Sequence, residues 1–416
     1  MKKRSALVFG ILFSLTTNLV ADGMDAKAIL LAKTLLIIDT HIDVPNRLRK
    51  NYEDVSKATE NGDFDYPRAI SGGLNAPFMS IYIPAELEAK GEDTALANQL
   101  IDDVENLIQQ APDKFYKACS SADVESSIKL NKIALPMGLE NGSPLAGDLK
   151  NLEHFWNRGI RYITLAHSKS NHISDSSYDS HRQWYGLSDF GKQLIPEMNK
   201  LGVMVDVSHI TDIAFYQVME ISKAPVIASH SSARYFTPNF ERNMSDEMII
   251  KLAQHQGVIQ VTFGSSFLDQ SARDAWDVFE EEEKQFVRDN TQLEPKSAEV
   301  EEFKKQYKQQ HPELWVSVDR VLDHIDHIVK LTSIDNVGIG SDYEGVGDSL
   351  PVGLKDVSSY PNLIKGLLKR GYDETAIEKI LSGNVLRVWK AVEQFAASQG
   401  TVTRHCLNNV GHFNKK

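Results

Sequence analysis

The sequence predicts a single (β/α)8 barrel of the TIM type. Eight short apolar runs occur along the 416 residues, and most are followed by a segment in which apolar residues recur with helical spacing. Strands that alternate with helices over this length are typical of a closed parallel barrel. An open doubly wound sheet would favour a glycine-rich phosphate turn after an early strand. Gly338 and Gly340 begin such a pattern, but Tyr343 stands at the third glycine and the pattern comes late.

The predicted strands are bounded by glycine, proline or polar residues. The first, in the stretch 35–45, has four consecutive apolar residues, which fits a strand buried on both faces. The others are predicted at 76–84, 133–140, 161–167, 203–209, 224–232, 258–264 and 336–342.

The predicted helices follow the strands. They lie at 93–111, 149–157, 188–201, 213–219, 246–255, 316–331, 360–370 and 374–395. Ser188 is expected to cap the third of them and Gly202 to end it. The stretch from about 266 to 314 is strongly charged, with four consecutive glutamates, and we interpret it as a solvated helical insertion after the seventh strand. Residues 22–416 therefore form one predicted catalytic domain.

Composition limits the compartment and the partners. A formal net charge of −12 argues against a nucleic-acid surface, which would need a basic face. Residues 1–21 have a basic start, an apolar core and Ala21 at the cleavage point, so a signal peptide is predicted. Its apolar core is too short for a comfortable membrane span, and no stable membrane anchor is expected. We expect an exported protein, periplasmic or secreted. The only cysteines, Cys119 and Cys406, leave pairing open.

Polar residues that can bind metal recur where the predicted strands end. His41 and Asp43 point to the same side of the first strand, because side chains alternate along a strand. The same design recurs at other strand ends, which carry Glu140, His167, His209, His230 and Asp342. A single strand-end histidine usually caps a loop. Six such ends among eight strands, all at one mouth of a barrel, predict a converging site instead.

Imidazole and carboxylate without thiolate suit zinc or another first-row divalent ion. Three histidines and two carboxylates suffice for two metals if one carboxylate bridges them. Two metals roughly 3.5–4 Å apart can share a water and lower its pKa, and a further carboxylate could move the proton. His324 and His327 are expected on a solvated helical face, and His172 and His181 in an exposed loop. Neither a His-Glu-x-x-His helix nor a Gly-x-Ser-x-Gly elbow occurs.

Seven ordered motifs resemble the renal (membrane) dipeptidase family of the amidohydrolase superfamily, in a bacterial form. They are Asp39 to Asp43, Gly138-Leu139-Glu140, Leu165-Ala166-His167-Ser168, Asp206-Val207-Ser208-His209, Ser229-His230-Ser231-Ser232, Arg242-Asn243 and Gly340-Ser341-Asp342. The similarity runs from about 35 to 393. One difference is Gly264, which stands where the mammalian members have a tyrosine.

The resemblance implies a hydrolase that binds two Zn²⁺ ions and cleaves small dipeptides, including those with a C-terminal D-residue. It implies that one zinc is bound by His41 and Asp43 and the other by His209 and His230, with Glu140 bridging. It also implies that His167 contacts the substrate and stabilises the oxyanion, that Arg242 holds the C-terminal carboxylate, and that Asp342 moves the proton. A homodimer is compatible with it. The alternatives are another binuclear amidohydrolase, such as an N-acyl amino-acid deacylase or lactonase, and an exported binding protein with a degenerate site.

Overall fold

The computed structural model describes residues 23–294 and 296–406, so the predicted signal peptide lies outside the described residues. Eight parallel strands form one sheet in the order β1-β2-β5-β6-β7-β8-β9-β10. They are β1 (Ile38–Ile42), β2 (Ala76–Tyr82), β5 (Met137–Glu140), β6 (Ile160–Thr164), β7 (Met204–Asp206), β8 (Ile227–Ser231), β9 (Val258–Val261) and β10 (Val337–Ile339).

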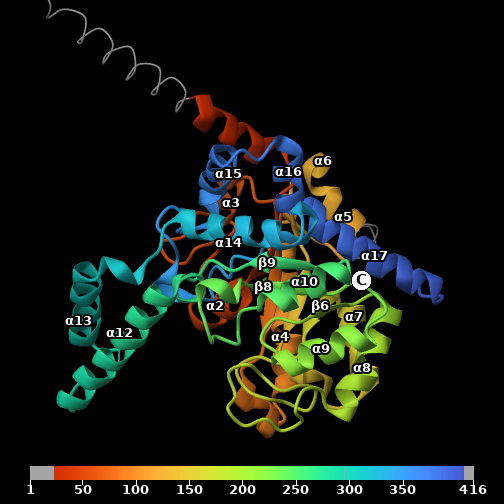
Figure 1. Ribbon diagram of the computed structural model, residues 1–416, viewed down its shortest axis with the longest axis horizontal. Coiled ribbons are helices and arrows are strands. Elements are labelled where there is room, and N and C mark those ends of the chain that lie inside the picture. Colours follow the sequence, from red (N-terminus) through yellow and green to blue (C-terminus); the bar gives the residue numbers. More distant parts are fainter. Residues whose placement is uncertain (1–22, 295, 407–416) are drawn as a thin grey trace, which may run out of the picture.

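The two outer strands of this order meet and close the sheet. The backbone N–H of Asp43 donates to the carbonyl of Tyr343 (2.9 Å), and the N–H of Asp342 donates to the carbonyl of His41 (3.0 Å). Helices surround the strands (Figure 1). The predicted (β/α)8 barrel is therefore confirmed.

The third predicted strand, 133–140, is divided in the structure. β4 (Ile133–Leu135) pairs with β3 (Phe115–Lys117) in a separate two-stranded parallel sheet, and only β5 belongs to the barrel. Pro136 separates the two pieces, since proline has no N–H to continue a strand ladder. The prediction of one continuous strand was wrong at this point.

The helices are close to the predicted ones. They are α2 (Val44–Lys50), α3 (Tyr66–Gly72), α4 (Asp93–Gln110), α5 (Ser121–Glu125), α6 (Ser127–Leu130), α7 (Leu149–Arg158), α8 (Asp189–Leu201), α9 (Asp212–Ile221), α10 (Asp246–Gln254), α11 (Ser265–Leu268), α12 (Gln270–Asp289), α13 (Ala298–Gln310), α14 (Val318–Leu331), α15 (Tyr360–Lys369), α16 (Glu374–Glu378) and α17 (Asn384–Ser398). The predicted helix 374–395 is interrupted by a π-helical turn at Lys379–Gly383. Ser188 caps α8 by accepting from the N–H of Gly191, and Gly202 ends it with φ 80°.

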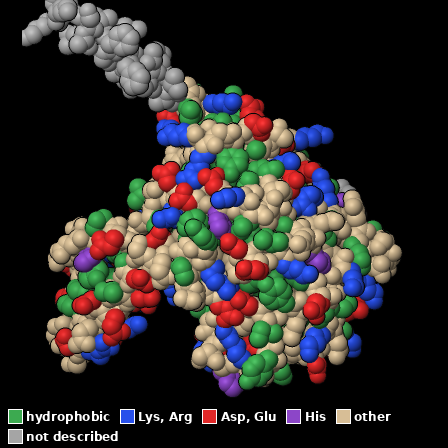
Figure 2. Space-filling view, in the orientation of Figure 1, with side chains coloured by type: hydrophobic (Ala, Val, Ile, Leu, Met, Phe, Trp, Pro, Cys, Tyr) green, Lys and Arg blue, Asp and Glu red, His purple; other side chains and the backbone are tan. Residues whose placement is uncertain are grey.

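The predicted insertion after the seventh barrel strand is helical, as expected. α12 and α13 project from the barrel as an arm at the left of Figure 1. Aromatic side chains join the two helices, and the rings of Phe286 and Phe303 stack with centroids 4.4 Å apart. Acidic, basic and apolar side chains are mixed over the visible face of the arm (Figure 2). The arm is therefore held by its own small aromatic contact, and its surface is solvated.

The end of the barrel where the strands begin is packed with apolar side chains. Trp389 of α17 is fully buried and lies 5.2 Å, centroid to centroid, from Phe78 of β2. Both belong to a cluster that also includes Tyr162, Met204 and Ile227 from the strands. This apolar cluster packs against the strands at the end where they begin. The polar residues lie at the opposite end, where the strands finish.

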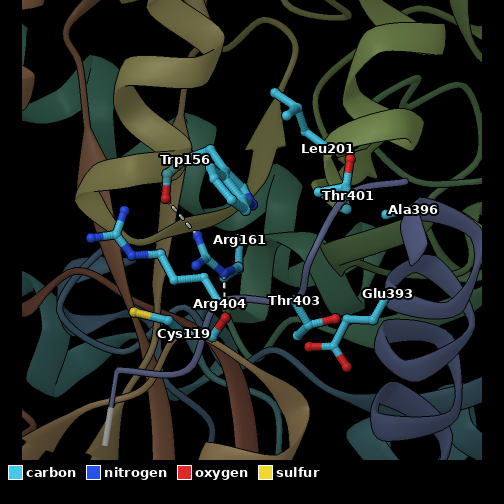
Figure 3. Close-up of a pocket in the computed structure, with 10 residues that line it drawn as sticks. Cys119, Trp156, Arg161, Leu201, Glu393, Ala396, Thr401, Thr403 and Arg404 are labelled. Carbon is cyan, nitrogen blue, oxygen red and sulfur yellow. Dashed lines mark hydrogen bonds between the residues drawn. The ribbon is translucent and has the colours of Figure 1, made fainter. Parts of the chain in front are cut away.

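The C-terminal segment closes over the same end of the barrel. Cys406 forms a disulfide with Cys119, 287 residues earlier, and so settles the pairing that the sequence left open. Figure 3 shows the small cavity beneath this segment, with Arg161 at the start of β6 facing Trp156. The guanidinium of Arg161 donates to the carbonyl of Trp156 (2.8 Å) and to that of Cys119. Because Arg161 is the second residue of β6 and the predicted site residues lie at the other ends of the strands, this cavity lies away from the predicted site.

Within 23–294 and 296–406, we find no helix whose length and apolar character would let it cross a bilayer.

Candidate active site

Buried hydrogen bonds hold the first strand end in place. The carboxylate of Asp39 accepts from the backbone N–H groups of His41 (3.1 Å) and Ser341 (2.9 Å), and its second oxygen accepts from the hydroxyl of Tyr360 (2.5 Å). The Nε2 atom of His41 lies 3.6 Å from Oδ2 of Asp43. Asp39 therefore joins β1 to β10 at the point where both deliver site residues.

Glu140, at the end of β5, lies at the centre of the site. Its Oε1 atom is 3.4 Å from Nε2 of each of His167, His209 and His230, and its Oε2 atom is 3.3 Å from Nε2 of His41. Burial favours the neutral acid, but the surrounding imidazoles outweigh burial and hold the pKa of Glu140 well below its ordinary value. The carboxylate is thus ionised and reaches residues from four different strands.

The ring of His230 is oriented by a chain of buried hydrogen bonds. The hydroxyl of Ser229 donates to Asp206 (2.6 Å) and lies 2.8 Å from Nδ1 of His230. Since the Ser229 proton is used on Asp206, its oxygen accepts from Nδ1–H, which leaves a lone pair on Nε2. That lone pair faces Nε2 of His209 at 2.8 Å. Burial lowers the pKa of both imidazoles well below the ordinary value, so both are neutral, as metal ligands must be.

Tyr162 reaches the site from inside the barrel. Its hydroxyl lies 2.8 Å from Nδ1 of His41, so it can fix the tautomer that presents Nε2 to the site. The ring passes directly over Gly138, where a Cβ atom would lie 2.0 Å from Cζ of Tyr162. A glycine is therefore required at 138 for Tyr162 to reach His41.

Two site residues have strained backbone conformations. His209 has φ 70° and Asp342 has φ 66°, in the left-handed region that non-glycine residues rarely adopt. Such a conformation costs on the order of 1 kcal/mol or more, and it persists only where the surrounding structure enforces it. Asp342 also requires Gly345, because a Cβ there would lie 2.1 Å from Oδ1 of Asp342 and 2.3 Å from Oδ2 of Asp43. The chain thus accepts local strain in order to aim these side chains at one point.

Arg242 is buried beside the imidazoles, whereas His167 is partly exposed. The guanidinium of Arg242 donates to the hydroxyl of Ser231 (2.8 Å) and the carbonyl of His230 (2.6 Å), and its Nη2 atom lies 3.1 Å from Nε2 of His209. Its Nε atom is buried without a hydrogen-bond partner among the described residues. The side chain of His167 is 18% exposed, whereas those of His41, His209 and His230 are at most 6% exposed.

The structure brings all the predicted site residues together. Seven of them form three overlapping groups in which ligand atoms lie within 4.8 Å of one another: His41, Glu140 and His230; Glu140, His167 and His209; and His41, Asp43 and Asp342. Arg242 contacts this cluster through His209. Proximity alone places His167 with the metal-binding candidates, but its greater exposure separates it from the enclosed imidazoles.

The donor set fits a metal centre. Among the described residues, Nε2 of His41 and Oδ1 of Asp43 are buried without a hydrogen-bond partner. Imidazole lone pairs and carboxylate oxygens that face one another repel unless a cation or proton lies between them. Divalent ions of the zinc type take these ligands.

One of the two histidines on α14 corrects the sequence prediction. His324 is fully buried, where Nδ1 accepts from the N–H of Ala233 (3.1 Å) and Nε2 donates to the carbonyl of Leu268 (2.8 Å). Burial lowers the pKa of His324 to about 3. His327 contacts Asp246 (2.8 Å) and is partly buried. The predicted solvated face was therefore wrong for His324, which is a core residue.

The exposed position predicted for the two loop histidines is confirmed for His181 and was wrong for His172. His181 is exposed, and His172 is partly buried with Nδ1 2.6 Å from Glu88.

The sequence prediction missed the supporting residues. Nothing in the sequence around Tyr162 distinguishes it from the other residues of its strand, so no signal indicated its contact with the site. Asp206 stands in the same sequence segment as His209, and a buried carboxylate there was available as a signal for an orienting partner. Gly345, three positions after Asp342, signals a close approach of the backbone only when the strand-end geometry is known.

A closed (β/α)8 barrel whose strand ends bring imidazoles and carboxylates together is typical of metal-dependent enzymes, metal-dependent hydrolases among them. The family model for membrane dipeptidase (peptidase family M19) matches residues 25–402. The chain belongs to this family of metallopeptidases, and its resemblance to it is confirmed.

Comparison with individual proteins supports the same family assignment. An uncharacterized dipeptidase of Schizosaccharomyces pombe is 32% identical over 380 residues, which cover 87% of this chain and 82% of the relative. A dipeptidase of Claviceps purpurea is 30% identical over 374 residues, covering 87% and 78%. The crystal structure of the probable dipeptidase PvdM from Pseudomonas aeruginosa superposes with a TM-score of 0.77 at 26% identity, covering 90% of this chain and 100% of that one.

Proposed function

We propose that this protein is an exported binuclear zinc dipeptidase that hydrolyses small dipeptides, including those with a C-terminal D-residue. The observation that carries the proposal is the convergence of four imidazoles and three carboxylates at the strand ends, in a chain that belongs to the membrane dipeptidase family. The extension to D-residues rests on the resemblance stated above.

His41 and Asp43 would hold one zinc ion, His209 and His230 the other, and Glu140 would bridge them. This assignment is supported by the contacts of the two Glu140 oxygens, Oε2 at 3.3 Å from His41 and Oε1 at 3.4 Å from His209 and His230. When bound, the ions supply Lewis acidity and a nucleophilic water of lowered pKa.

The chain's own residues bind and orient the dipeptide. Arg242 would hold the C-terminal carboxylate, because a guanidinium presents several N–H donors in one plane to a carboxylate. His167, the most exposed of the four imidazoles, would donate a hydrogen bond to the oxygen of the scissile carbonyl as negative charge develops on it.

Asp342 would move the proton from the attacking water to the leaving amine. Burial raises the pKa of Asp342, and the neighbouring carboxylates of Asp43 and Glu140 raise it further against the opposing charge of His41. A carboxylate with a raised pKa accepts a proton more readily than an ordinary carboxylate, as this role requires.

The proposed location is outside the cytoplasm, either periplasmic or secreted, after removal of residues 1–21. The support is the basic and apolar N-terminal pattern. N-terminal sequencing of protein recovered from the exported fraction tests this, and recovery of the chain with Met1 intact would contradict it.

A panel of L,L- and L,D-dipeptides, assayed before and after chelation and again with added zinc, tests the activity. We expect hydrolysis that is lost on chelation and returns with zinc. Hydrolysis of N-acyl amino acids or lactones in preference to dipeptides would favour a different amidohydrolase, and a protein with neither bound metal nor hydrolysis would indicate a binding protein.

The variant Arg242→Ala tests how the substrate is held. We expect kcat/KM for dipeptides with a free C-terminal carboxylate to fall by about 100-fold, because a charge-assisted hydrogen bond is lost. The matched C-terminal amides provide the control and should lose much less. Equal losses on acids and amides would reject the assigned role of Arg242.

A further inference from the structure

The start of the helical insertion forms one wall of the site. Phe267 of α11 accepts a hydrogen bond at its carbonyl from the side-chain amide of Asn243 (2.7 Å), and its ring lies 5.6 Å from the guanidinium carbon of Arg242. The ring also fills the space beside Gly264, where a Cβ atom would lie 2.6 Å from Cδ2 of Phe267. The insertion is therefore built into the site at its root, although its distal part projects away (Figure 1).

Arg273, in the first turn of α12, lies beside the same group of aromatic side chains. Its guanidinium carbon lies 3.6 Å from the ring centroid of Phe240. The ring of Phe240 is 5.8 Å from that of Phe267 and 6.0 Å from that of Tyr178, and Tyr178 is in turn 6.0 Å from the ring of His209. A continuous row of aromatic rings thus links Arg273 to the metal-binding candidates.

Both arginines and Asp342 influence the pKa of Tyr178, which lies in the same row of rings. Burial raises the pKa of the Tyr178 hydroxyl, the positive charges of Arg242 and Arg273 oppose the rise, and Asp342 adds to it. The hydroxyl therefore lies in the fields of both arginines and of the proposed proton carrier. The two arginines are held by neighbouring rings, because Arg242 lies 5.6 Å from Phe267, Arg273 lies 3.6 Å from Phe240, and these two rings are 5.8 Å apart.

The guanidinium of Arg273 has no acidic partner among the residues that the structure describes. The neighbouring carboxylates are already engaged, because Asp269 pairs with Arg320 (2.7 Å) and Glu241 pairs with Arg182. Stacking on Phe240 occupies the face of the guanidinium and leaves its in-plane N–H groups available. A partly buried arginine held in this way is oriented for an anionic ligand before that ligand arrives.

We propose that Arg273 is a specificity-determining residue that binds the acidic side chain of the substrate's C-terminal residue. The preferred substrates are then dipeptides that end in Asp or Glu. The inference rests on the proposed function, since Arg242 holds the main-chain carboxylate and thereby directs the adjacent side chain along the aromatic row towards Arg273. In a chain of net charge −12, a local cation is also needed to attract a substrate with two carboxylates.

The test compares isosteric substrates, Ala-Glu with Ala-Gln and Ala-Asp with Ala-Asn, on the metal-loaded enzyme. We expect the wild-type protein to prefer the acidic member of each pair. In Arg273→Gln the ratio of kcat/KM values, acidic over neutral, should fall by roughly tenfold or more, which corresponds to one charge-assisted hydrogen bond. Arg273→Lys keeps the charge and should retain most of the ratio. Arg273→Glu should lower it further and raise kcat/KM for Ala-Lys.

Arg288→Gln is the matched control, because it removes the same charge from the far end of α12, where Arg288 is exposed and pairs with Glu281. It should leave the ratio unchanged. An equal loss on acidic and neutral substrates in Arg273→Gln, or the same change of ratio in Arg288→Gln, would overturn the proposal. A wild-type protein that hydrolyses all four dipeptides without preferring the acidic ones would overturn it while leaving the dipeptidase function intact. Failure to hydrolyse any of the four, or other dipeptides, would instead reject the dipeptidase function.

Discussion

The two ends of the barrel are formed by the same strands but are built in opposite ways. At the end where the strands begin, Trp389 and the strand side chains Phe78 and Met204 pack in a fully buried apolar cluster, and a disulfide fastens the C-terminal segment nearby. At the end where the strands finish, the buried side chains are imidazoles and carboxylates, and some of their polar atoms have no hydrogen-bond partner among the described residues.

The difference indicates that one end of the barrel contributes stability and the other end holds the candidate active site. Apolar packing lowers the free energy of the folded state. Buried polar atoms without a hydrogen-bond partner raise it, and so do residues with a left-handed backbone conformation, such as His209 and Asp342. A barrel can carry a costly site at one end because the other end is stabilised independently of it. Substitutions at the two ends should therefore separate activity from stability.

Glu140→Gln should give the largest effect, and it acts on activity. The amide keeps the volume of the side chain but removes the negative charge that four imidazoles face. We expect kcat/KM for dipeptides to fall by about 10⁴-fold or more, equivalent to about 5.5 kcal/mol of transition-state stabilisation. Metal content, measured by atomic absorption, should fall with it, while the circular dichroism spectrum stays native.

The control for this variant is Glu153→Gln, which makes the same change of charge at an exposed position on α7 and should be silent. A Glu140→Gln protein that retains activity within tenfold of wild type would show that the strand-end cluster is not the catalytic centre. The contrast between the two ends would then have no functional meaning.

Trp389→Ala should give the next largest effect, and it acts on stability. Removal of a fully buried indole should lower the free energy of unfolding by about 3–5 kcal/mol, measured by urea denaturation. The kcat/KM of the protein that remains folded should stay within about twofold of wild type. Because Nε1 of Trp389 has no hydrogen-bond partner among the described residues, Trp389→Phe is a suitable control and should cost much less. A large loss of activity in folded Trp389→Ala would contradict the independence of the two ends.

The sequence predicted the strand ends well because the relevant signals are local. An apolar run followed at once by His41 and Asp43, or by His209, needs no knowledge of distant residues, and barrel topology then places all such ends together. A local signal was also available for Pro136, which divides a predicted strand, because proline seldom continues a ladder. It was available for His324 as well, since Val321, Ile325 and Ile328 share its helical face.

Other features could not be predicted from the sequence, because they depend on residues far apart in the chain. The disulfide joins cysteines 287 residues apart, and nothing in their sequence neighbourhoods indicates that they meet. The contact between Tyr162 and His41 crosses the barrel interior over Gly138, and the stack of Arg273 on Phe240 depends on the path of the insertion. Such contacts become visible only when the strands have been placed in space.

Tyr162→Phe should give the smallest effect and is the sharpest test, because Tyr162 belongs to both ends. Its ring lies in the apolar cluster and its hydroxyl contacts Nδ1 of His41. Without that hydroxyl the imidazole loses the partner that fixes its tautomer, so we expect metal affinity, measured by competition with a chelator, to fall by about tenfold. The free energy of unfolding of the chelated protein should change by about 1 kcal/mol or less.

Tyr116→Phe is the matched control. It removes a hydroxyl of the same cluster, one that donates to the carbonyl of Asp123 (2.7 Å) and is remote from the site. If Tyr116→Phe weakened metal binding as much as Tyr162→Phe, the loss of affinity would come from weaker packing of the whole cluster. The contact between Tyr162 and His41 would then have no specific role in metal binding.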